Sequence, residues 1–259
     1  MLLAIVAFLI GISVALLGLV AERLAIYIPF SLEEELVSKS NFIGRDDRSE
    51  VTQYLQRISK QLEEYIDTPE GIHYTIHYSE STVKNAYATL GGHIYIFRGL
   101  LMILPNENAL AMVIAHEMAH IKYRHPVIAL GRGVVIGLFL ASLSGFSGDK
   151  LVGQIVNNTG MLTLLKFNRD QEREADRTAL AAVAGYYGHV TGAADLFKIL
   201  EELEEANYLN PPLILSTHPL NRERIENIYR LARDNGWRLI GITDTIPDSI
   251  QAAIQAEPD

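Results

Sequence analysis

The sequence predicts a mainly α-helical α+β domain with a small antiparallel sheet, preceded by an N-terminal transmembrane anchor. Three observations predict this class. An uncharged apolar run opens the chain, apolar residues recur at helical spacing in several long segments, and short alternating runs lie between the first two of these segments. With 259 residues, the chain is long enough for one domain of roughly 200 residues and an appendage.

The composition narrows the class of protein further. The formal net charge is -9, which argues against a nucleic-acid partner. The absence of cysteine excludes disulfides and thiolate zinc ligands but leaves the cellular compartment open. Nothing in the composition indicates an oligomeric state.

Residues 1–21 carry no charge, and as a helix they would be about 32 Å long, close to the hydrocarbon thickness of a bilayer. We expect an uncleaved anchor rather than a signal peptide, because no Lys or Arg precedes the apolar run and Leu19-Val20-Ala21 is a poor cleavage site. Arg23 and Lys39 follow the run, and this positive charge favours a cytoplasmic location for the chain after the anchor. Neighbouring glutamates weaken this indication.

Residues 22–45 are predicted to be a connector, in which residues 27–30 lie at the membrane interface or pack back on the domain. The domain itself begins with a helix over residues 46–66. One face of this helix is apolar, through Val51, Tyr54, Leu55, Ile58, Leu62 and Ile66.

Short alternating runs predict the sheet. Residues 72–78 are strand-like, and residues 84–88 and 93–97 flank Gly91-Gly92, a turn signal typical of a β-hairpin. We therefore expect a small antiparallel sheet next to the following helix.

The side chains and edges of these strands suggest two roles. His73 and His77 would point to the same side of their strand, and we interpret them as surface or sheet-packing histidines. The edge of the sheet can hold an extended peptide through main-chain hydrogen bonds. The candidate residues for this strand are Asn85, Ala86, Tyr87 and Ala88.

The chemistry is concentrated in a helix predicted over residues 107–123, with Asn106 as its N-cap. His116 and His120 are four residues apart, so their imidazoles lie on one face and can bind one metal ion. Glu117 lies beside them and could take a proton from a metal-bound water. This is the HExxH arrangement of zinc metallohydrolases.

An apolar region follows the motif helix. Residues 133–148 and 151–165 are uncharged, with Asp149-Lys150 between them, and each is too short to cross a bilayer comfortably. We interpret residues 127–165 as an inserted hydrophobic hairpin that packs on the domain or dips into the membrane surface. Two short transmembrane helices are the alternative.

A second helix, predicted over residues 168–185, carries paired carboxylates. Glu172 and Asp176 lie on one face, whereas Glu174 points elsewhere. A catalytic zinc ion often takes Glu as its third protein ligand and leaves the fourth position for water. We therefore expect Glu172 to be the third ligand and Asp176 to orient a ligating imidazole.

Other candidate ligands can be sorted by spacing. The pattern HExxHxxGxxH is excluded by Tyr123 and Pro126, and His125 is off register, which makes it a helix-end residue. His218 precedes a predicted helix and could stabilise an oxyanion, contact the metal or simply bond locally. Residues 237–259 resemble a weakly ordered tail.

In their order along the chain, these motifs resemble the membrane-associated zinc endopeptidases of the HtpX, BepA and CAAX-prenyl-protease type (metallopeptidase family 48). The stretch 85–95 is similar to the strand and turn before that family's active helix, with Leu90 where the family usually has Pro. The resemblance covers roughly residues 46–236 and implies a zincin-like metalloprotease domain. The resemblance rests on three motifs, which are His116-Glu117-x-x-His120, Glu172-x-x-Ala175-Asp176 and His218-Pro219 with Arg224.

The resemblance implies one Zn²⁺ per chain on His116, His120 and Glu172, with Glu117 as general base. Asp176 would lie behind the ligands, and His218 and Arg224 would belong to the cleft and its support. The expected activity is cleavage of misfolded or membrane-associated proteins by a single-anchor enzyme of the quality-control branch, at a lipid bilayer. The family favours an extracytoplasmic active site, so the membrane side stays open.

Two other functions fit the sequence less well. A membrane-linked holdase or adaptor would use the strand edge and the hydrophobic hairpin, with zinc only structural, but the complete set of catalytic carboxylates argues against it. A metal-dependent hydrolase of a non-peptide substrate is the other alternative, and the sheet beside the motif helix favours an extended peptide instead.

Overall fold

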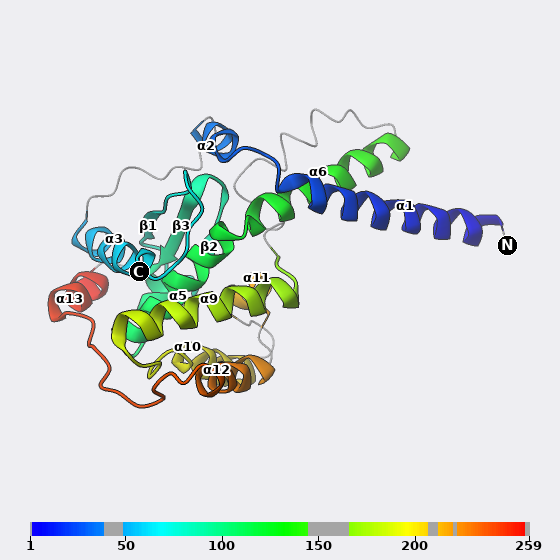
Figure 1. Ribbon diagram of the computed structural model, residues 1–259. Helices are drawn as coiled ribbons and strands as arrows, with labels where there is room; N and C mark the ends of the chain where they lie inside the picture. The colour runs from blue at the N-terminus through cyan, green and yellow to red at the C-terminus, as the bar shows by residue number, and fades with distance from the viewer. Residues whose placement is uncertain (1, 39–48, 145–165, 207–211, 220–221, 257–259) are drawn as a thin grey trace.

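The computed structural model describes residues 2–38, 49–144, 166–206, 212–219 and 222–256 (Figure 1). Within these ranges the chain is mainly helical with a three-stranded sheet, which confirms the α+β class. The strands are β1 (Thr75–Ser79), β2 (Ala86–Ala88) and β3 (His93–Phe97), and the 3-10 turn η1 is Leu90–Gly92. The helices are α1 (Leu2–Ala25), α2 (Phe30–Ser38), α3 (Glu50–Glu63), α4 (Arg98–Leu101), α5 (Glu107–Lys122), α6 (His125–Ser144), α9 (Arg169–Tyr187), α10 (Asp195–Ala206), α11 (Ile214–Thr217), α12 (Arg222–Asp234) and α13 (Asp248–Ala256).

Helix α5 is the predicted motif helix, and it lies in the core. Asn106 caps it, because the side-chain oxygen of Asn106 accepts a hydrogen bond from the Ala109 amide at 2.8 Å. Every residue from Asn108 to Ile121 is buried, against α3, the sheet and α9. A helix buried on all sides holds its polar residues in fixed positions, which is what a metal centre requires.

The sheet has the strand order β1-β3-β2, and its pairing corrects the predicted antiparallel sheet. β2 and β3 are antiparallel, as the Gly91-Gly92 turn predicts, but β1 runs parallel to β3. This pairing depends on a close approach between distant segments. A Cβ on Gly92 would lie 2.0 Å from the carbonyl oxygen of His73, so glycine is needed where the two strands begin.

Helix α1 contains the predicted anchor, continues to Ala25 and packs along α6 (Figure 1). Several of its large apolar side chains are exposed, among them Leu9, Leu16 and Leu24. None of the described helices qualifies alone as a membrane span by length and hydropathy. The pair Leu9–Ala25 and Phe30–Ser38, bent by 102°, qualifies when taken together.

Two predicted segments extend beyond the described residues. The connector ends at residues 39–45, which lie outside them, and its earlier part contains α2. The predicted hydrophobic hairpin begins in α6, and its remainder, residues 145–165, also lies outside them. Helix α6 starts directly after α5, at His125 and Pro126.

The segment after α1 is tied to the end of α5 by an ion pair between a buried carboxylate and a half-buried arginine. Glu33 on α2 is buried, accepts a hydrogen bond from the Gly91 amide at 3.1 Å and pairs with Arg124. Arg124 also donates a hydrogen bond to the carbonyl oxygen of Ile28 at 2.6 Å. This arginine adopts a left-handed backbone conformation, with φ at 61°, where the chain turns from α5 into α6.

Glu33→Ala is expected to lower the free energy of unfolding by about 3 kcal/mol, because it leaves the Arg124 guanidinium without its buried carboxylate partner. Denaturant unfolding followed by circular dichroism measures this change. Glu35→Ala is the matched control, since Glu35 is exposed on the same helix and its removal should change stability by less than about 0.5 kcal/mol. Equal effects of the two substitutions would contradict a role for the pair.

The C-terminal region is not the weakly ordered tail that the sequence suggested. Helix α13 packs on α3, and its Ile250 and Ile254 are buried in the main core (Figure 1). The Arg98 side chain donates a hydrogen bond to the Ile254 carbonyl oxygen at 2.8 Å. The short apolar stripe of α13 is therefore part of the domain core.

Candidate metal centre

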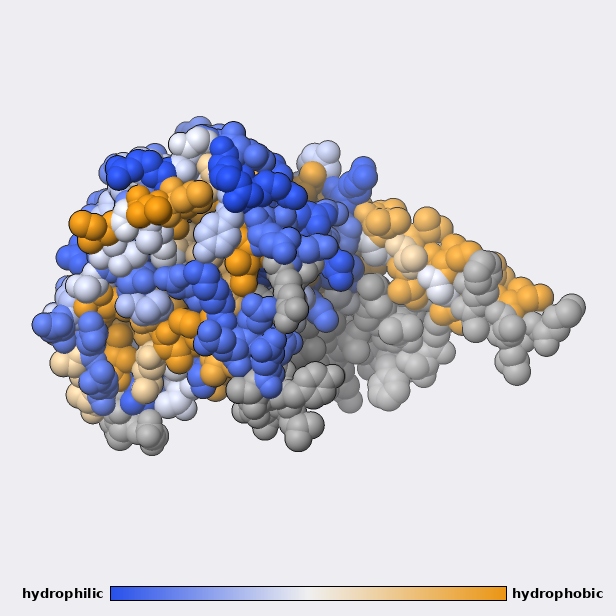
Figure 2. All heavy atoms as spheres, turned by 90° about the horizontal axis from the view of Figure 1, so that it is seen from below, coloured by the Kyte–Doolittle hydropathy of each residue, from blue (hydrophilic) through white to orange (hydrophobic). Residues whose placement is uncertain are grey.

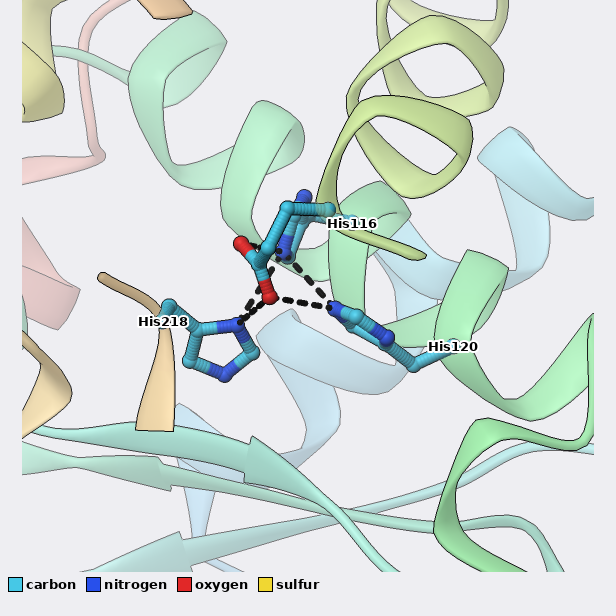
Figure 3. A group of neighbouring side chains, drawn as sticks. His116, His120 and His218 are labelled. Atoms are coloured by element: carbon cyan, nitrogen blue, oxygen red, sulfur yellow. Dashed lines mark hydrogen bonds and ion pairs between the residues drawn. The ribbon is translucent and has the colours of Figure 1, made fainter. Parts of the chain in front are cut away.

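Helices α5 and α9 and the residue after α11 bring four side chains to one point. The Nε2 atoms of His116 and His120 are 2.9 Å apart, and Glu172 from α9 has a carboxylate oxygen 3.6 Å from each of them. His218 places Nδ1 3.1 Å from Glu172 Oε1 and 3.3 Å from His116 Nε2 (Figure 3). One ligand atom from each residue lies within 4.8 Å of the others, and all four residues are buried.

This donor set fits one zinc ion. Nitrogen and oxygen ligands about 2.0–2.1 Å from a tetrahedral zinc ion lie about 3.3 Å from each other. The separations between ligand atoms that involve His116 Nε2 or a Glu172 carboxylate oxygen range from 2.9 to 3.6 Å. Burial and the neighbouring imidazoles lower the pKa of His120, so its ring is neutral and can offer a lone pair.

The electrostatics also favour a cation. Burial alone would lower the pKa of His218, but the carboxylates of Glu117 and Glu172 raise it overall. Burial would likewise raise the pKa of Glu172, but His218 and Arg224 lower it. The buried carboxylates thus create a negative potential at the point where the four ligand atoms meet.

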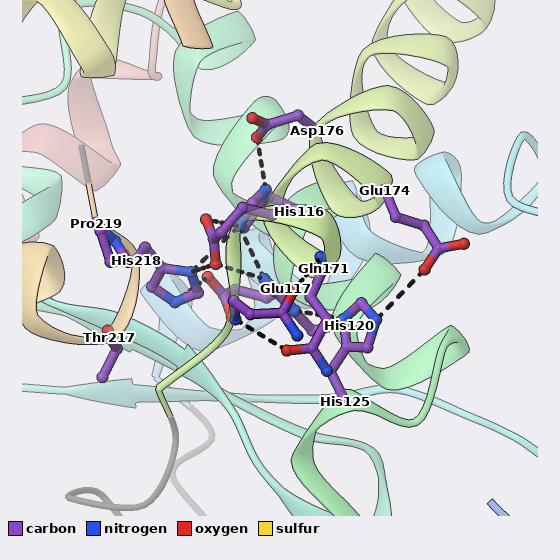
Figure 4. A network of polar contacts seen from close by, with 12 residues as sticks. His116, Glu117, His120, His125, Gln171, Glu174, Asp176, Thr217, His218 and Pro219 are labelled. Atoms are coloured by element: carbon purple, nitrogen blue, oxygen red, sulfur yellow. Dashed lines mark hydrogen bonds and ion pairs between the residues drawn. The ribbon is translucent and has the colours of Figure 1, made fainter. Parts of the chain in front are cut away.

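Asp176 and Arg224 hold the ligands from behind. Asp176 Oδ1 lies 3.0 Å from His116 Nδ1, which directs the opposite nitrogen of that ring toward the cluster (Figure 4). Arg224 donates hydrogen bonds of 2.8 and 2.7 Å to Asp176 and pairs with Glu172 at 2.8 Å. Burial opposes ionisation of Asp176, but Arg224 and His116 lower its pKa overall.

Glu117 lies next to the cluster and is 1% exposed. Its Oε1 is 3.5 Å from His218 Nε2, and its Oε2 has no hydrogen-bond partner among the described residues. A buried carboxylate oxygen without a donor is costly, which indicates that a further group binds beside it.

Comparison with known proteins identifies the family to which the chain belongs. The family model described as Peptidase family M48 matches residues 49–232. The chain belongs to peptidase family M48. This confirms the predicted family, a family of zinc metallopeptidases, and the four buried side chains of the cluster could hold a metal ion.

Three relatives of this M48 peptidase illustrate the match. Mitochondrial metalloendopeptidase OMA1 of Schizosaccharomyces pombe is 30% identical over 181 residues, which cover 68% of this chain and 52% of that protein. The beta-barrel assembly-enhancing protease of Escherichia coli (strain K12) is 30% identical over 192 residues, 68% of this chain and 37% of that protein. A putative beta-barrel assembly-enhancing protease of Vibrio cholerae is 28% identical over 161 residues, 58% and 32% respectively. The chain thus spans about half or less of the length of these relatives.

His125 supports the centre of this M48 peptidase in a way that the sequence did not reveal. It stands at the start of α6, as a helix-end residue should, but it is buried and its Nδ1 lies 2.8 Å from His120 Nδ1. Burial lowers the pKa of His125 to about 4. Glu174 points away from the four ligand atoms, as the sequence predicts, and lies 3.5 Å from the other nitrogen of His125 (Figure 4).

Phe167 is a second residue that sequence reasoning missed. Its ring stacks on His120, with the centroids 3.9 Å apart, and lies 5.4 Å from the ring of His218. Phe167 is buried, so it excludes water from one side of the cluster. The sequence gives little sign of this role beyond an aromatic residue directly before the N-cap of α9.

Glu117 borders an apolar pocket, and the predicted substrate strand packs against the helix that carries Glu117. Helix α11 lies against β2, and the Ile214 amide donates a hydrogen bond of 3.2 Å to the Lys84 carbonyl oxygen. Asn85, Ala86, Tyr87 and Ala88 are all buried. The pocket is bounded by His116, Glu117 and His218, and its apolar lining is Met112, Val113, Leu196, Phe197, Leu200 and Ile214.

Proposed function

We propose that this M48 peptidase is anchored in a membrane and cleaves extended segments of misfolded or membrane-associated proteins. The observation that carries this proposal is the buried set His116, His120 and Glu172 with the Glu117 carboxylate beside it. The proposed peptidase domain is residues 46–236, preceded by the anchor.

Each residue of the site has a distinct proposed role. His116, His120 and Glu172 would hold the zinc ion, which when bound lowers the pKa of a coordinated water toward about 7 and polarises the scissile carbonyl. Glu117 accepts a proton from the attacking water and passes it to the leaving amine. Asp176 and Arg224 keep His116 and Glu172 oriented through the contacts described above.

His218 has two possible roles, and its position favours metal contact over oxyanion stabilisation, because its Nδ1 lies among the other ligand atoms. We therefore expect His218→Ala to raise the dissociation constant for zinc. Competition with a zinc chelator measures that constant. A loss of cleavage by about 10²–10³-fold with unchanged zinc affinity would assign His218 to the oxyanion instead.

The substrate is proposed to bind as an extended strand beside β2. β2 is an edge strand, so a peptide could pair with residues 85–88 by main-chain hydrogen bonds once α11 moves aside. The apolar pocket beside Glu117 would accept an apolar side chain close to the scissile bond. Both features suit unfolded polypeptide, which exposes apolar side chains and unpaired backbone.

Membrane anchoring is supported by α1. Hydrophobic residues cover the arm that α1 forms (Figure 2), and its exposed large side chains include Ile5, Ile12, Leu19 and Val20. Burial of this surface in a bilayer would be favourable by roughly 25 cal/mol per Å² of apolar area. One relative is named as a mitochondrial metalloendopeptidase, and another is named for enhancing beta-barrel assembly.

Removal of zinc with 1,10-phenanthroline is expected to abolish cleavage of casein by the full chain, and added Zn²⁺ is expected to restore it. Mg²⁺ should not restore it, because Mg²⁺ prefers oxygen ligands and octahedral geometry. Release of fluorescent peptides from labelled casein measures both steps. Undiminished cleavage by chelated protein would refute the proposed mechanism.

A second candidate function has one observation in its favour. Four side chains converge on the site and bury it, and a closed four-ligand set is typical of structural zinc. In that case the protein would act as a membrane-linked holdase or adaptor. It would bind unfolded protein with intact zinc but show no casein cleavage, so the same assay separates the two functions.

A further inference from the structure

A second group of histidines lies where α2 packs against η1, close to the starts of β1 and β3. His77 belongs to β1, His93 begins β3, His73 precedes β1, and Glu34 belongs to α2. None of these residues has a role in the proposed mechanism.

His77 and His93 meet directly. His77 Nε2 lies 2.7 Å from His93 Nδ1, and the ring centroids are 5.0 Å apart. The ring of His77 also stacks on Tyr95 with a centroid separation of 4.6 Å, which restrains its orientation. Two imidazole nitrogens directed at each other either share one proton or bind one metal ion through both lone pairs.

His73 and Glu34 form a second pair at the same place. His73 Nε2 lies 2.8 Å from Glu34 Oε1, and the two side chains are 60% and 40% exposed. The Gly91-Gly92 turn brings this pair next to His93. The point where a Gly91 Cβ would stand is 3.2 Å from the Glu34 Cα atom and 3.5 Å from His93 Cδ2.

The protonation state of His93 favours metal binding at this place. Burial, followed by the charges of His77 and His73, lowers the pKa of His93 to about 4, although Glu34 acts in the opposite direction. The imidazole of His93 is therefore neutral at pH 7, which is the form that binds metal ions.

We propose that His77 and His93, together with His73 and Glu34, form a second site for a divalent transition-metal ion, with zinc as the reference ion. Imidazole ligands suit zinc, copper and nickel, and a carboxylate also ligates zinc. His73 and Glu34 pair with each other in the structure, and both exposed side chains would turn toward an ion held by the other two residues. The bound ion would fasten α2 to β1 and β3.

The test counts zinc ions on the full chain. Protein is dialysed to equilibrium against buffered free Zn²⁺ at pH 7, and bound zinc is measured by atomic absorption. We expect two zinc ions per chain in the unaltered protein and one in the His77→Gln/His93→Gln double variant. Thr75→Ala is the matched control, because Thr75 lies between His73 and His77 on the same face, and it should keep two.

Two more variants test the proposal even if the double variant fails to fold. His73→Gln changes an exposed side chain and should weaken binding of the second zinc ion by at least about tenfold, because it removes one of the four proposed ligands. Glu172→Ala removes the catalytic ligand and should leave one zinc ion, bound at the histidine group. The proposal would be overturned if the unaltered protein saturates at one zinc ion, or if the folded double variant still binds a second zinc ion. His77 and His93 would then be a pair of histidines that share a proton.

Discussion

Glu117→Gln is expected to abolish cleavage of an unfolded test protein while zinc content and fold stay unchanged. Glutamine has nearly the same shape as glutamate but cannot accept the proton, and general-base catalysis contributes about 10²–10⁴-fold. Glu117 is buried beside the cluster without being needed to complete the metal-ligand set, so its loss should not release the metal. Initial rates of casein cleavage, together with zinc analysis, measure both properties.

Glu174→Gln is the matched control for this variant. Glu174 lies close by on α9, but its side chain is 48% exposed and faces His125 rather than the four ligand atoms. It should keep most of the activity. Unchanged cleavage by Glu117→Gln would show that Glu117 is not the general base. If Glu117→Gln is inactive but folded, this variant can trap bound substrates in cells, which would reveal their class and compartment together.

Glu172→Ala is expected to lose zinc at the catalytic centre, with a fall in affinity of more than about 100-fold, whereas Glu174→Ala should keep it. The difference follows from position on α9. Glu172 reaches to within 3.6 Å of the ligating nitrogen of His120, whereas Glu174 reaches only to His125. Asp176→Ala should reduce the zinc affinity by about 10–100-fold, a loss between those of the other two variants, because Asp176 acts on the metal through His116.

Metal content of the three variants after dialysis against a chelating buffer decides this prediction. Circular dichroism is needed in parallel, because Glu172 also pairs with the buried Arg224. Arg224 keeps its two hydrogen bonds to Asp176, so we expect Glu172→Ala to fold. Full zinc retention at the catalytic centre in this variant would contradict the assignment of the third ligand, and the mechanism with it.

Much of the centre could be predicted because its signals are local. The periodicity of residues 107–123 and the Asn106 cap fix α5, and the spacing of His116 and His120 follows from the geometry of one helical turn. Glu172 and Asp176 are recognised in the same way, from their spacing on α9. The sequence alone could not establish that α5 and α9 meet, although the family pattern implied it.

The parts that were missed depend on contacts between distant segments. The parallel pairing of β1 with β3 is decided by the close approach of His73 to Gly92, not by alternation within either strand. His125 and Phe167 gain their roles only when α6 and the start of α9 fold over His120. α13 is too short to give a clear periodic signal, yet its isoleucines complete the core against α3.

The junction of Arg124, Glu33 and Ile28 has a consequence for where a substrate can be cut. It joins the end of the motif helix to the segment that follows α1, and α6 begins at the next residue. In a bilayer-anchored enzyme, this junction would hold the catalytic residues at a constant height above the lipid headgroups. The distance between the membrane surface and the cleavage site would then be constant, and substrate segments that emerge at that height would be cut first.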